Sequence, residues 1–169
     1  MSEADLGRLI VLTSRGDNDA FSKLYVKTGR GVYAFLYTYF HNREDTEDAM
    51  QTVYLKIKNG ASSFNEGTNA RAWILQIAKN HAINVINKKN REVVTDDIRA
   101  VDTKDNFGTV TDAMERCLTE EEQRIITLHV LWGYKHREIA KRLDCPTGTV
   151  TSKYKRAVEK LRNALKEEK

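Results

Sequence analysis

Residues 133–165 have the sequence GYKHREIAKRLDCPTGTVTSKYKRAVEKLRNAL, which predicts two helices joined by a tight turn. The first helix carries Ile139 and Ala140 on one side, and Ala140 is small enough for a second helix to cross close by. Pro146 cannot continue the first helix but is tolerated in the opening turn of the next, so the chain must turn at residues 144–146. This pattern is typical of a helix-turn-helix.

The second of these helices has two sides of different chemistry. Apolar residues recur at three- and four-residue spacing on its inward side, namely Val150, Tyr154, Ala157, Leu161 and Leu165. The outward side carries Gly148, Ser152, Lys155 and Arg156, flanked by Thr149, Thr151 and Lys153. Residues 147–166 hold six basic side chains against one acid, which is the electrostatic field that phosphate neutralisation needs. A solvated basic face is the alternative, but the preceding helix and turn favour contact with DNA.

Composition bounds the remaining possibilities. The chain has 169 residues and a net charge of +4, which predicts one domain or two small ones. Two isolated cysteines, no CxxC pair and four scattered histidines indicate neither a disulfide framework nor a metal or cofactor site. No apolar run approaches the roughly 20 residues that span a bilayer, and residues 1–13 lack the features of a signal peptide. We therefore expect a cytoplasmic protein without direct membrane insertion.

The first ninety residues predict four helices. We expect them at residues 2–14, 19–40, 44–58 and 70–90, with a polar loop over residues 59–69. The buried side of the fourth is expected to contain Trp73, Ile74, Ile77, Ala78, His81 and Val85. Phe64 and Trp73 are interpreted as packing residues of the core.

The second half of the chain begins with an acidic stretch. Residues 92–112 hold six acids and two bases with few apolar residues, which predicts a mobile linker. Thr119 and Glu122 then match the capping box of a helix start, and Ile125, Ile126, His129 and Val130 follow at helical spacing. The fold expected is all-α, with small helical domains at residues 1–91 and 110–169 joined by a flexible acidic linker at 92–109. The second domain ends in the helix-turn-helix.

The third predicted helix, at residues 44–58, has two faces of different composition. Thr46, Ala49, Met50, Val53 and Ile57 form its core stripe, whereas Asp48, Gln51, Thr52 and Leu55 lie opposite. An outward leucine among a carboxylate, an amide and a hydroxyl has the composition of an interface centre with a polar rim. A single exposed leucine is also common on ordinary surfaces, so the pattern by itself leaves both interpretations open.

Three segments resemble the bacterial sigma factors of the sigma-70 family. Residues 44–55, EDTEDAMQTVYL, are similar to the family's DAEDxxQexF segment, and residues 73–84, WILQIAKNHAIN, resemble its WLyrIAxNxxxD segment. Residues 138–157, EIAKRLDCPTGTVTSKYKRA, resemble EIAxxLgxpxGTVxSRxxRA. The motifs occur in the family's order, and no further domain separates them. The chain is thereby identified as a member of the short extracytoplasmic-function class.

That resemblance implies a promoter-specificity subunit of RNA polymerase with no catalysis of its own. The third helix would bind the clamp helices of the polymerase β′ subunit through Asp48, Gln51, Thr52 and Leu55. The resemblance also admits an anti-sigma factor as a partner.

The resemblance further implies two promoter-binding surfaces. The melted −10 element would contact the 63–71 loop and the fourth helix through Asn65, Thr68, Asn69, Arg71, Asn80, Ile83, Asn84 and Lys88. Lys89 and Arg91 would add phosphate contacts. The −35 duplex would contact Thr149, Thr151, Ser152, Lys153, Lys155 and Arg156. Arg156 is assigned a base contact and Lys160 a contact with phosphate only.

The chain departs from the family pattern at three positions. Asn87 stands where the family usually has arginine, Asn84 where it often has aspartate, and Lys153 where it has the arginine of the SR pair.

Two other functions remain open at this stage. A sigma-like decoy that occupies an anti-sigma factor would not need the cations of the last helix. A helix-turn-helix regulator that acts without polymerase would leave the 48–55 face unexplained. An enzyme is disfavoured because no paired carboxylates, activated nucleophile or phosphate loop can be assembled from the motifs.

Overall fold

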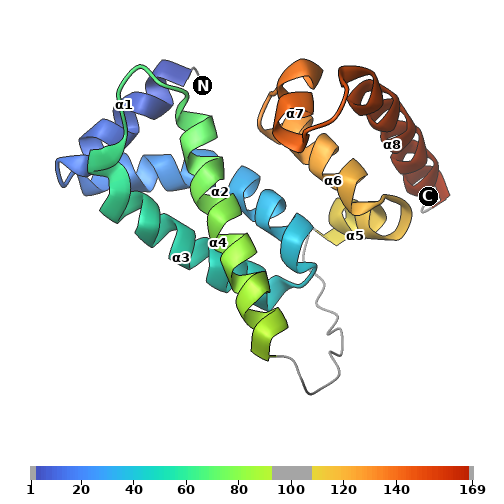
Figure 1. Ribbon diagram of the computed structural model, residues 1–169, viewed down its shortest axis with the longest axis horizontal. Coiled ribbons are helices and arrows are strands. Elements are labelled where there is room, and N and C mark those ends of the chain that lie inside the picture. The colour runs from blue at the N-terminus through green and yellow to red at the C-terminus, as the bar shows by residue number, and fades with distance from the viewer. Residues whose placement is uncertain (1–2, 93–107, 168–169) are drawn as a thin grey trace. The chain divides into compact units, whose positions relative to one another are not determined.

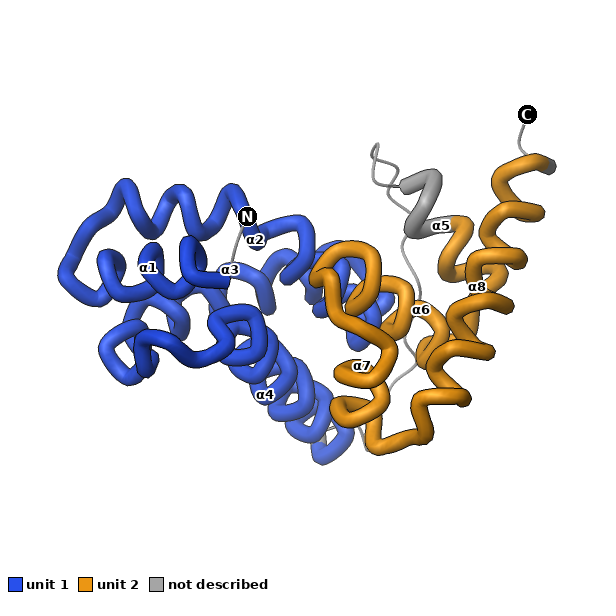
Figure 2. The backbone as a smooth tube through the Cα atoms, turned by 90° about the horizontal axis from the view of Figure 1, so that it is seen from above, with its two compact units in different colours: residues 1–101 blue, residues 102–169 orange. Residues whose placement is uncertain are grey.

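The computed structural model describes residues 3–92 and 108–167, and every regular element within them is helical, as predicted. The chain divides into two compact units, Met1–Val101 and Asp102–Lys169, which Figure 2 colours separately. Unit 1 contains α1 (Glu3–Ser14), α2 (Asn18–Phe40), α3 (Arg43–Gly60) and α4 (Ala70–Glu92) (Figure 1). Unit 2 contains α5 (Gly108–Cys117), α6 (Glu120–Ile126), α7 (His136–Leu143) and α8 (Thr147–Glu167). Residues 93–107 of the predicted linker lie outside the described part.

Local signals set the helix ends in unit 1. Gly16 adopts a positive φ of 88° after α1, and the Asp17 side chain then accepts a hydrogen bond from the amide of Ala20 to cap α2. His41 ends α2 in the left-handed region, and the Asn42 side chain caps α3 through the amide of Asp45. The third helix is longer than predicted. It runs to Gly60 and passes into a 3-10 turn at Ala61–Ser63, so the expected polar loop begins only after residue 63.

The core of unit 1 forms where α2 packs against α1, α3 and α4. Its largest fully buried side chains are Ile10, Leu24, Val32, Leu36, Thr46, Val53, Ile57, Ile74 and Leu75. A Cβ atom on Gly29 would lie 3.3 Å from the Met50 Cε, so the glycine lets α3 approach α2 closely. Nearby, the Tyr54 hydroxyl lies 2.7 Å from that of Thr28, which itself donates to the Leu24 carbonyl.

The buried side of α4 agrees with the prediction at Ile74 and Ala78 and differs from it elsewhere. Ile74, Leu75, Ala78 and Ala82 are buried, whereas Trp73, Ile77, His81 and Val85 are only half-buried. The reason is that α4 contacts α1, α2 and α3 together, which moves the centre of the buried arc away from the stripe expected for a single neighbour. Phe64 is buried as predicted, and its ring packs edge-to-face on Trp73 at 5.5 Å between centroids.

Unit 2 is built around α8, which packs against α5, α6 and α7. Thr119 and Glu122 form the predicted capping box at the start of α6. One π-helical turn, Thr127–Leu131, follows α6 and shifts the side-chain register, so Val130 is exposed although helical spacing placed it with the inward residues. Asp144 ends α7 in the left-handed region, and the Cys145 amide donates to the Ala140 carbonyl in the predicted turn.

The inward stripe of α8 is confirmed except at its end. Val150 and Ala157 are fully buried, and Tyr154 and Leu161 are half-buried. Leu165 is 37% exposed, because the apolar cluster that covers α8 ends at Leu161, one turn earlier. The helix-turn-helix is therefore held by the first two thirds of α8.

Candidate docking and nucleic-acid interfaces

The outward face of α3 is exposed, as its sequence predicts. Asp48, Gln51 and Leu55 are exposed and Thr52 is half-buried, and together these four residues define the α3 ridge. Leu55 is 61% exposed in spite of its apolar side chain. Since Ala49, Val53 and Ile57 face the core, the ridge can be changed without opening the core.

The start of α3 is joined to the end of α4 by an ion pair. The Lys89 ammonium group lies 2.7 Å from Asp45 Oδ2, which also accepts a hydrogen bond from the Asn42 amide group. The hydrogen bond from Lys89 is the main reason that the pKa of Asp45 lies below its ordinary value. Lys89, which we expected to contact phosphate, therefore binds a carboxylate of its own unit.

Residues 64–69 form a structured loop that leads into α4. The buried side chain of Phe64 anchors the loop to the core, and the Thr68 hydroxyl donates to the Asn65 carbonyl at 2.7 Å. The Asn69 side chain accepts from the Ala72 amide at 2.7 Å and thus caps α4. The side chains of Thr68 and Asn69 therefore stabilise the loop, and Asn65 is exposed at its surface.

Arg71 is held by a residue that the sequence did not point to. Its amide donates to Glu3 Oε1 at 2.8 Å, and its guanidinium Nε lies 3.4 Å from Glu3 Oε2. Glu3 is 68 residues away in the chain, so no local pattern could have paired the two. The contact joins the first turn of α1 to the first turn of α4.

The α4 face predicted to contact the −10 element is exposed along its length. Asn80, Ile83, Asn84 and Lys88 are all exposed, with Ile83 at 37%. The Asn80 side chain accepts from the Gln76 amide group at 2.7 Å. The face thus presents amides around one apolar side chain, a surface suited to an unstacked base.

The outward face of α8 is confirmed by its exposure. Gly148, Ser152, Lys155 and Arg156 are exposed and define the α8 face. Apart from its chain neighbours and the backbone of its own helix, nothing lies within 4 Å of the position that a Gly148 Cβ would take, and the Ser152 hydroxyl donates to the Thr149 carbonyl at 3.0 Å. The cations on this face can approach a duplex without displacing a bulky side chain.

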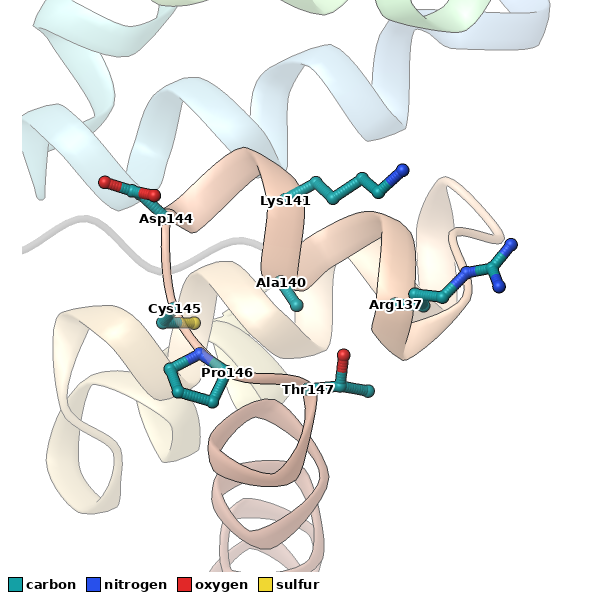
Figure 3. A pocket seen from close by; sticks show the side chains of 7 residues that line it. All are labelled: Arg137, Ala140, Lys141, Asp144, Cys145, Pro146 and Thr147. Atoms are coloured by element: carbon teal, nitrogen blue, oxygen red, sulfur yellow. The ribbon is translucent and has the colours of Figure 1, made fainter.

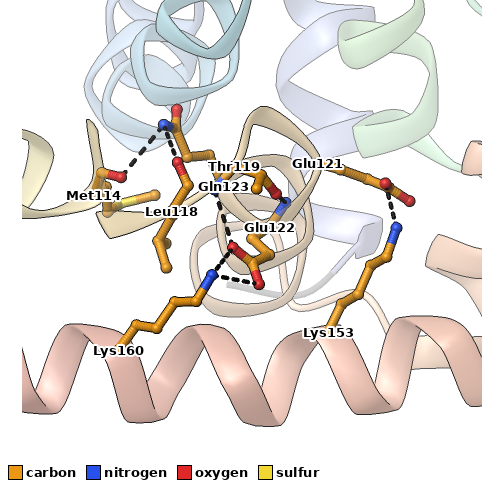
Figure 4. A network of polar contacts seen from close by, with 8 residues as sticks. All are labelled: Met114, Leu118, Thr119, Glu121, Glu122, Gln123, Lys153 and Lys160. Carbon is orange, nitrogen blue, oxygen red and sulfur yellow. Dashed lines mark hydrogen bonds and ion pairs between the residues drawn. The ribbon is translucent and has the colours of Figure 1, made fainter. Parts of the chain in front are cut away.

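The two flanks of the α8 face have other partners. The Thr151 hydroxyl donates to the Thr147 carbonyl at 3.0 Å and lies 3.1 Å from His136 Nδ1. Lys153 forms an ion pair with Glu121 of α6 (Figure 4). Both residues are half-buried, so the structure directs them to α6 and α7 rather than outward.

Lys160, which we expected to contact only phosphate, has an acidic partner within its own unit. Its ammonium group lies 2.8 and 3.1 Å from the two carboxylate oxygens of Glu122 (Figure 4). Glu122 is buried and also accepts from the Thr119 amide at 3.0 Å. Lys160 therefore neutralises a buried capping carboxylate.

A hollow of about 480 Å³ lies beside the turn of the helix-turn-helix (Figure 3). Arg137 and Lys141 of α7 contribute cations to its lining, and Thr147 contributes the start of α8. Sequence reasoning did not select these two cations. The sequence did contain a signal for them: Arg137 and Lys141 are four residues apart, on the side of the first helix opposite Ile139.

No group of three or more His, Cys, Asp or Glu side chains in the described part of the chain could hold a metal ion. None of the helices in residues 3–92 and 108–167 combines the length and apolar character needed to cross a membrane.

Comparison with known proteins supports the same two-part organisation. Residues 24–92 match the Sigma-70 region 2 family model, and residues 112–161 match that of Sigma-70 region 4. The chain is 30% identical to the ECF RNA polymerase sigma-E factor of Haemophilus influenzae, and the alignment covers 93% of each protein. It is 24% identical to the RNA polymerase sigma-H factor of Pseudomonas aeruginosa, over 94% of this chain and 92% of that one.

Two solved structures share the fold. One is the sigma factor RpoE in complex with the anti-sigma factor NepR from Bartonella quintana, with a TM-score of 0.63, 23% identity, and coverage of 86% of this chain and 96% of that one. The other is CnrH in complex with the cytosolic domain of CnrY, with a TM-score of 0.61, 18% identity, and coverage of 98% and 99%. The resemblance drawn from three sequence motifs is confirmed. The chain belongs to the extracytoplasmic-function class of the sigma-70 family and is a sigma factor that directs RNA polymerase to promoters.

Proposed function

We propose that the chain divides this work between two domains, residues 1–91 and 110–169, with residues 92–109 as their tether. The observation that carries the proposal is that one chain exposes two surfaces of different chemistry. The α3 ridge combines an apolar centre with a polar rim, and the α8 face combines hydroxyls with cations. The first composition suits a protein partner and the second suits duplex DNA.

In this proposal the α3 ridge binds the clamp helices of the polymerase β′ subunit. Leu55 is the anchor, and Asp48, Gln51 and Thr52 form the rim around it. Interface energy is usually concentrated in a few such anchors, whereas rim residues mainly exclude water. The burial of Ala49, Val53 and Ile57 on the other side of α3 supports the proposal, since it fixes the ridge to the core of unit 1.

The same domain would bind the melted −10 element. Asn65 on the loop and Asn80, Ile83, Asn84 and Lys88 on α4 provide amides, one apolar contact and a cation. Thr68, Asn69 and Arg71 would act through the loop, because their hydrogen bonds hold the loop and the start of α4 in place. Proteins hold single strands through cations that follow the backbone and through side chains that contact the bases.

The second domain would bind the −35 duplex through α8. Arg156 has a planar fork that can bond two acceptors of a guanine, and Ser152 and Lys155 lie beside it on the α8 face. Thr149 lies at the edge of that face. Arg137 and Lys141 of α7 would contact phosphate, because the first helix of such a motif crosses the DNA backbone.

The alternatives explain fewer of these surfaces. A decoy without DNA contact leaves the exposed cations of α8 unexplained, and a regulator that acts without polymerase leaves the α3 ridge unexplained. We propose no catalytic activity. An anti-sigma factor is proposed as a further partner, because both solved structures described above are complexes with an anti-sigma factor or a partner's cytosolic domain. The work would take place in the cytoplasm, where polymerase and promoters are found.

Run-off transcription tests the proposal. Purified polymerase core is combined with the full chain on a promoter selected by that holoenzyme from a random library. We expect transcripts that require both the core and the chain. Failure to transcribe any selected template, or transcription that survives Leu55→Ala and Arg156→Ala together, would contradict the proposal.

A further inference from the structure

We propose that Glu121 of α6 and Lys153 of α8 are positioning residues that fix the rotation of α8, and that Lys153 makes no contact with promoter DNA. This inference rests on the proposed contact between α8 and the −35 duplex. It reassigns a lysine that the sequence pattern placed among the DNA contacts, and it gives a role to an acidic residue outside the motif.

Two consecutive glutamates of α6 bind two lysines of α8. Glu121 pairs with Lys153 and Glu122 with Lys160 (Figure 4). The lysines are separated by two helical turns, or about 10 Å along the axis, and therefore lie on the same side of α8. Two ties at that separation oppose both sliding and rotation of α8 against α6.

A further contact holds α8 on its opposite flank. At about 100° per residue, Lys153 lies about 60° from Val150 in one direction and Thr151 about 100° from it in the other. The Thr151 hydroxyl uses its proton on the Thr147 carbonyl, so His136 Nδ1 must be the donor in its contact with that hydroxyl. α7 thus holds one flank of α8 while α6 holds the other.

Lys155 and Arg156 are more accessible to DNA than Lys153. The Lys153 side chain is 25% exposed and its ammonium group already binds a carboxylate, whereas Lys155 and Arg156 are exposed on the α8 face. A partly exposed ion pair adds little to stability. Its expected effect is therefore on the direction of the α8 face, which decides which base edges the face meets.

A charge exchange separates positioning from DNA contact. The full chain and polymerase core form open complexes on the selected promoter and on the same promoter with a scrambled −35 element, and the ratio of the two rates is measured. A wild-type ratio near one would refute the proposed −35 contact itself, independently of this inference. With a wild-type preference established, the ratio is measured for Lys153→Glu, Glu121→Lys and the double variant.

We expect each single variant to lower the ratio about fivefold through like-charge repulsion, and the double variant to regain most of it. Lys155→Glu serves as the matched control, and Glu121→Lys should not rescue it. If Lys153 contacts DNA, the double variant stays as impaired as Lys153→Glu, and this outcome overturns the inference. An unchanged ratio in the single variants also overturns it.

If the helical content shows that a charge-reversed variant does not fold, neutral substitutions are tested in the same assay. Lys153→Met keeps the stem of the side chain and Glu121→Gln keeps its shape. If the two residues act only through each other, the double neutral variant loses no more of the ratio than either single one. Additive losses would show that Lys153 has a partner beyond Glu121 and would contradict the proposal.

Discussion

Lys160 of α8 binds both oxygens of Glu122, the carboxylate that closes the capping box of α6. Glu122 has only 5% of its side chain exposed, so its charge depends on Lys160 and on the Thr119 amide. One contact thus satisfies a buried charge, completes a helix start and joins α6 to α8.

We predict that Lys160→Ala destabilises unit 2 by about 1–3 kcal/mol, because it leaves a buried carboxylate without its cation. The estimate lies below the largest values for buried pairs because Lys160 itself is partly exposed. The chain has two tryptophans, Trp73 in unit 1 and Trp132 in unit 2. A Trp73→Phe background therefore lets Trp132 fluorescence report urea unfolding of unit 2.

Lys166→Ala is the control for this measurement, since Lys166 is exposed in the last turn of α8. It should leave the unfolding free energy within about 0.5 kcal/mol of the parent. Equal unfolding curves for the Lys160 and Lys166 variants would show that Glu122 is satisfied in another way.

The stability of unit 2 should fall as the pH falls. Burial and the neighbouring His129 lower the pKa of His136 below 6.5, so the unfolded chain takes up this proton more readily than the folded one. Burial raises the pKa of Glu122, but the hydrogen bonds from Lys160 and Thr119 outweigh it and leave the pKa below 4.5. Both groups therefore stabilise at neutral pH, and their contributions are lost on acidification, first that of His136 and then that of Glu122.

The measurement is the same Trp132 unfolding assay between pH 7.5 and 4. His136→Gln should flatten the decline between pH 7 and 5, because it keeps a side-chain donor but does not titrate. The exposed His41→Gln in unit 1 should leave it unchanged. A stability that rises as the pH falls through 6.5 would have the wrong sign for a depressed histidine pKa.

The sequence predicted the helices well because their signals are local. Gly16 and Asp17 mark one boundary, Thr119 and Glu122 another, and Pro146 the turn, and each acts within a few residues. The buried arc of α4 was less predictable. The position of this arc depends on the three helices that α4 contacts. The apolar stripe of α4 alone does not show how many helices pack against it.

The exposed faces that we propose as interfaces were predictable from the sequence, but the contacts of their individual residues were not. Exposure of the α3 ridge and the α8 face followed from helical periodicity. The partners of Lys153 and Lys160 did not, because Glu121 and Glu122 lie 32 and 38 residues away in the chain. A basic side chain on a recognition helix therefore cannot be assigned to phosphate until its intramolecular acids are known.

We predict that Leu55→Ala and Asp48→Lys weaken binding to polymerase core and leave helical content and melting temperature nearly unchanged. Both side chains point away from the core of unit 1, and loss of an interface anchor typically costs upward of about 2 kcal/mol. Titration of labelled full chain with purified core measures the effect. Val26→Ala on α2, an exposed apolar residue outside the ridge, is the matched control. Equal affinity of all four proteins would exclude the α3 ridge as the docking surface.

The last prediction separates base recognition from phosphate binding on unit 2. Arg156→Ala should cost about 1–3 kcal/mol on a selected −35 element and much less on a scrambled one, because only the correct base pair offers two acceptors to its fork. Arg137→Ala on α7 should instead weaken both DNAs alike and reduce the slope of log affinity against log salt by about one. The assay is a salt titration of holoenzyme binding to both promoters, followed by fluorescence anisotropy. If Arg156→Ala loses the same free energy on both promoters, Arg156 binds phosphate, and base selection must come from other residues of the α8 face.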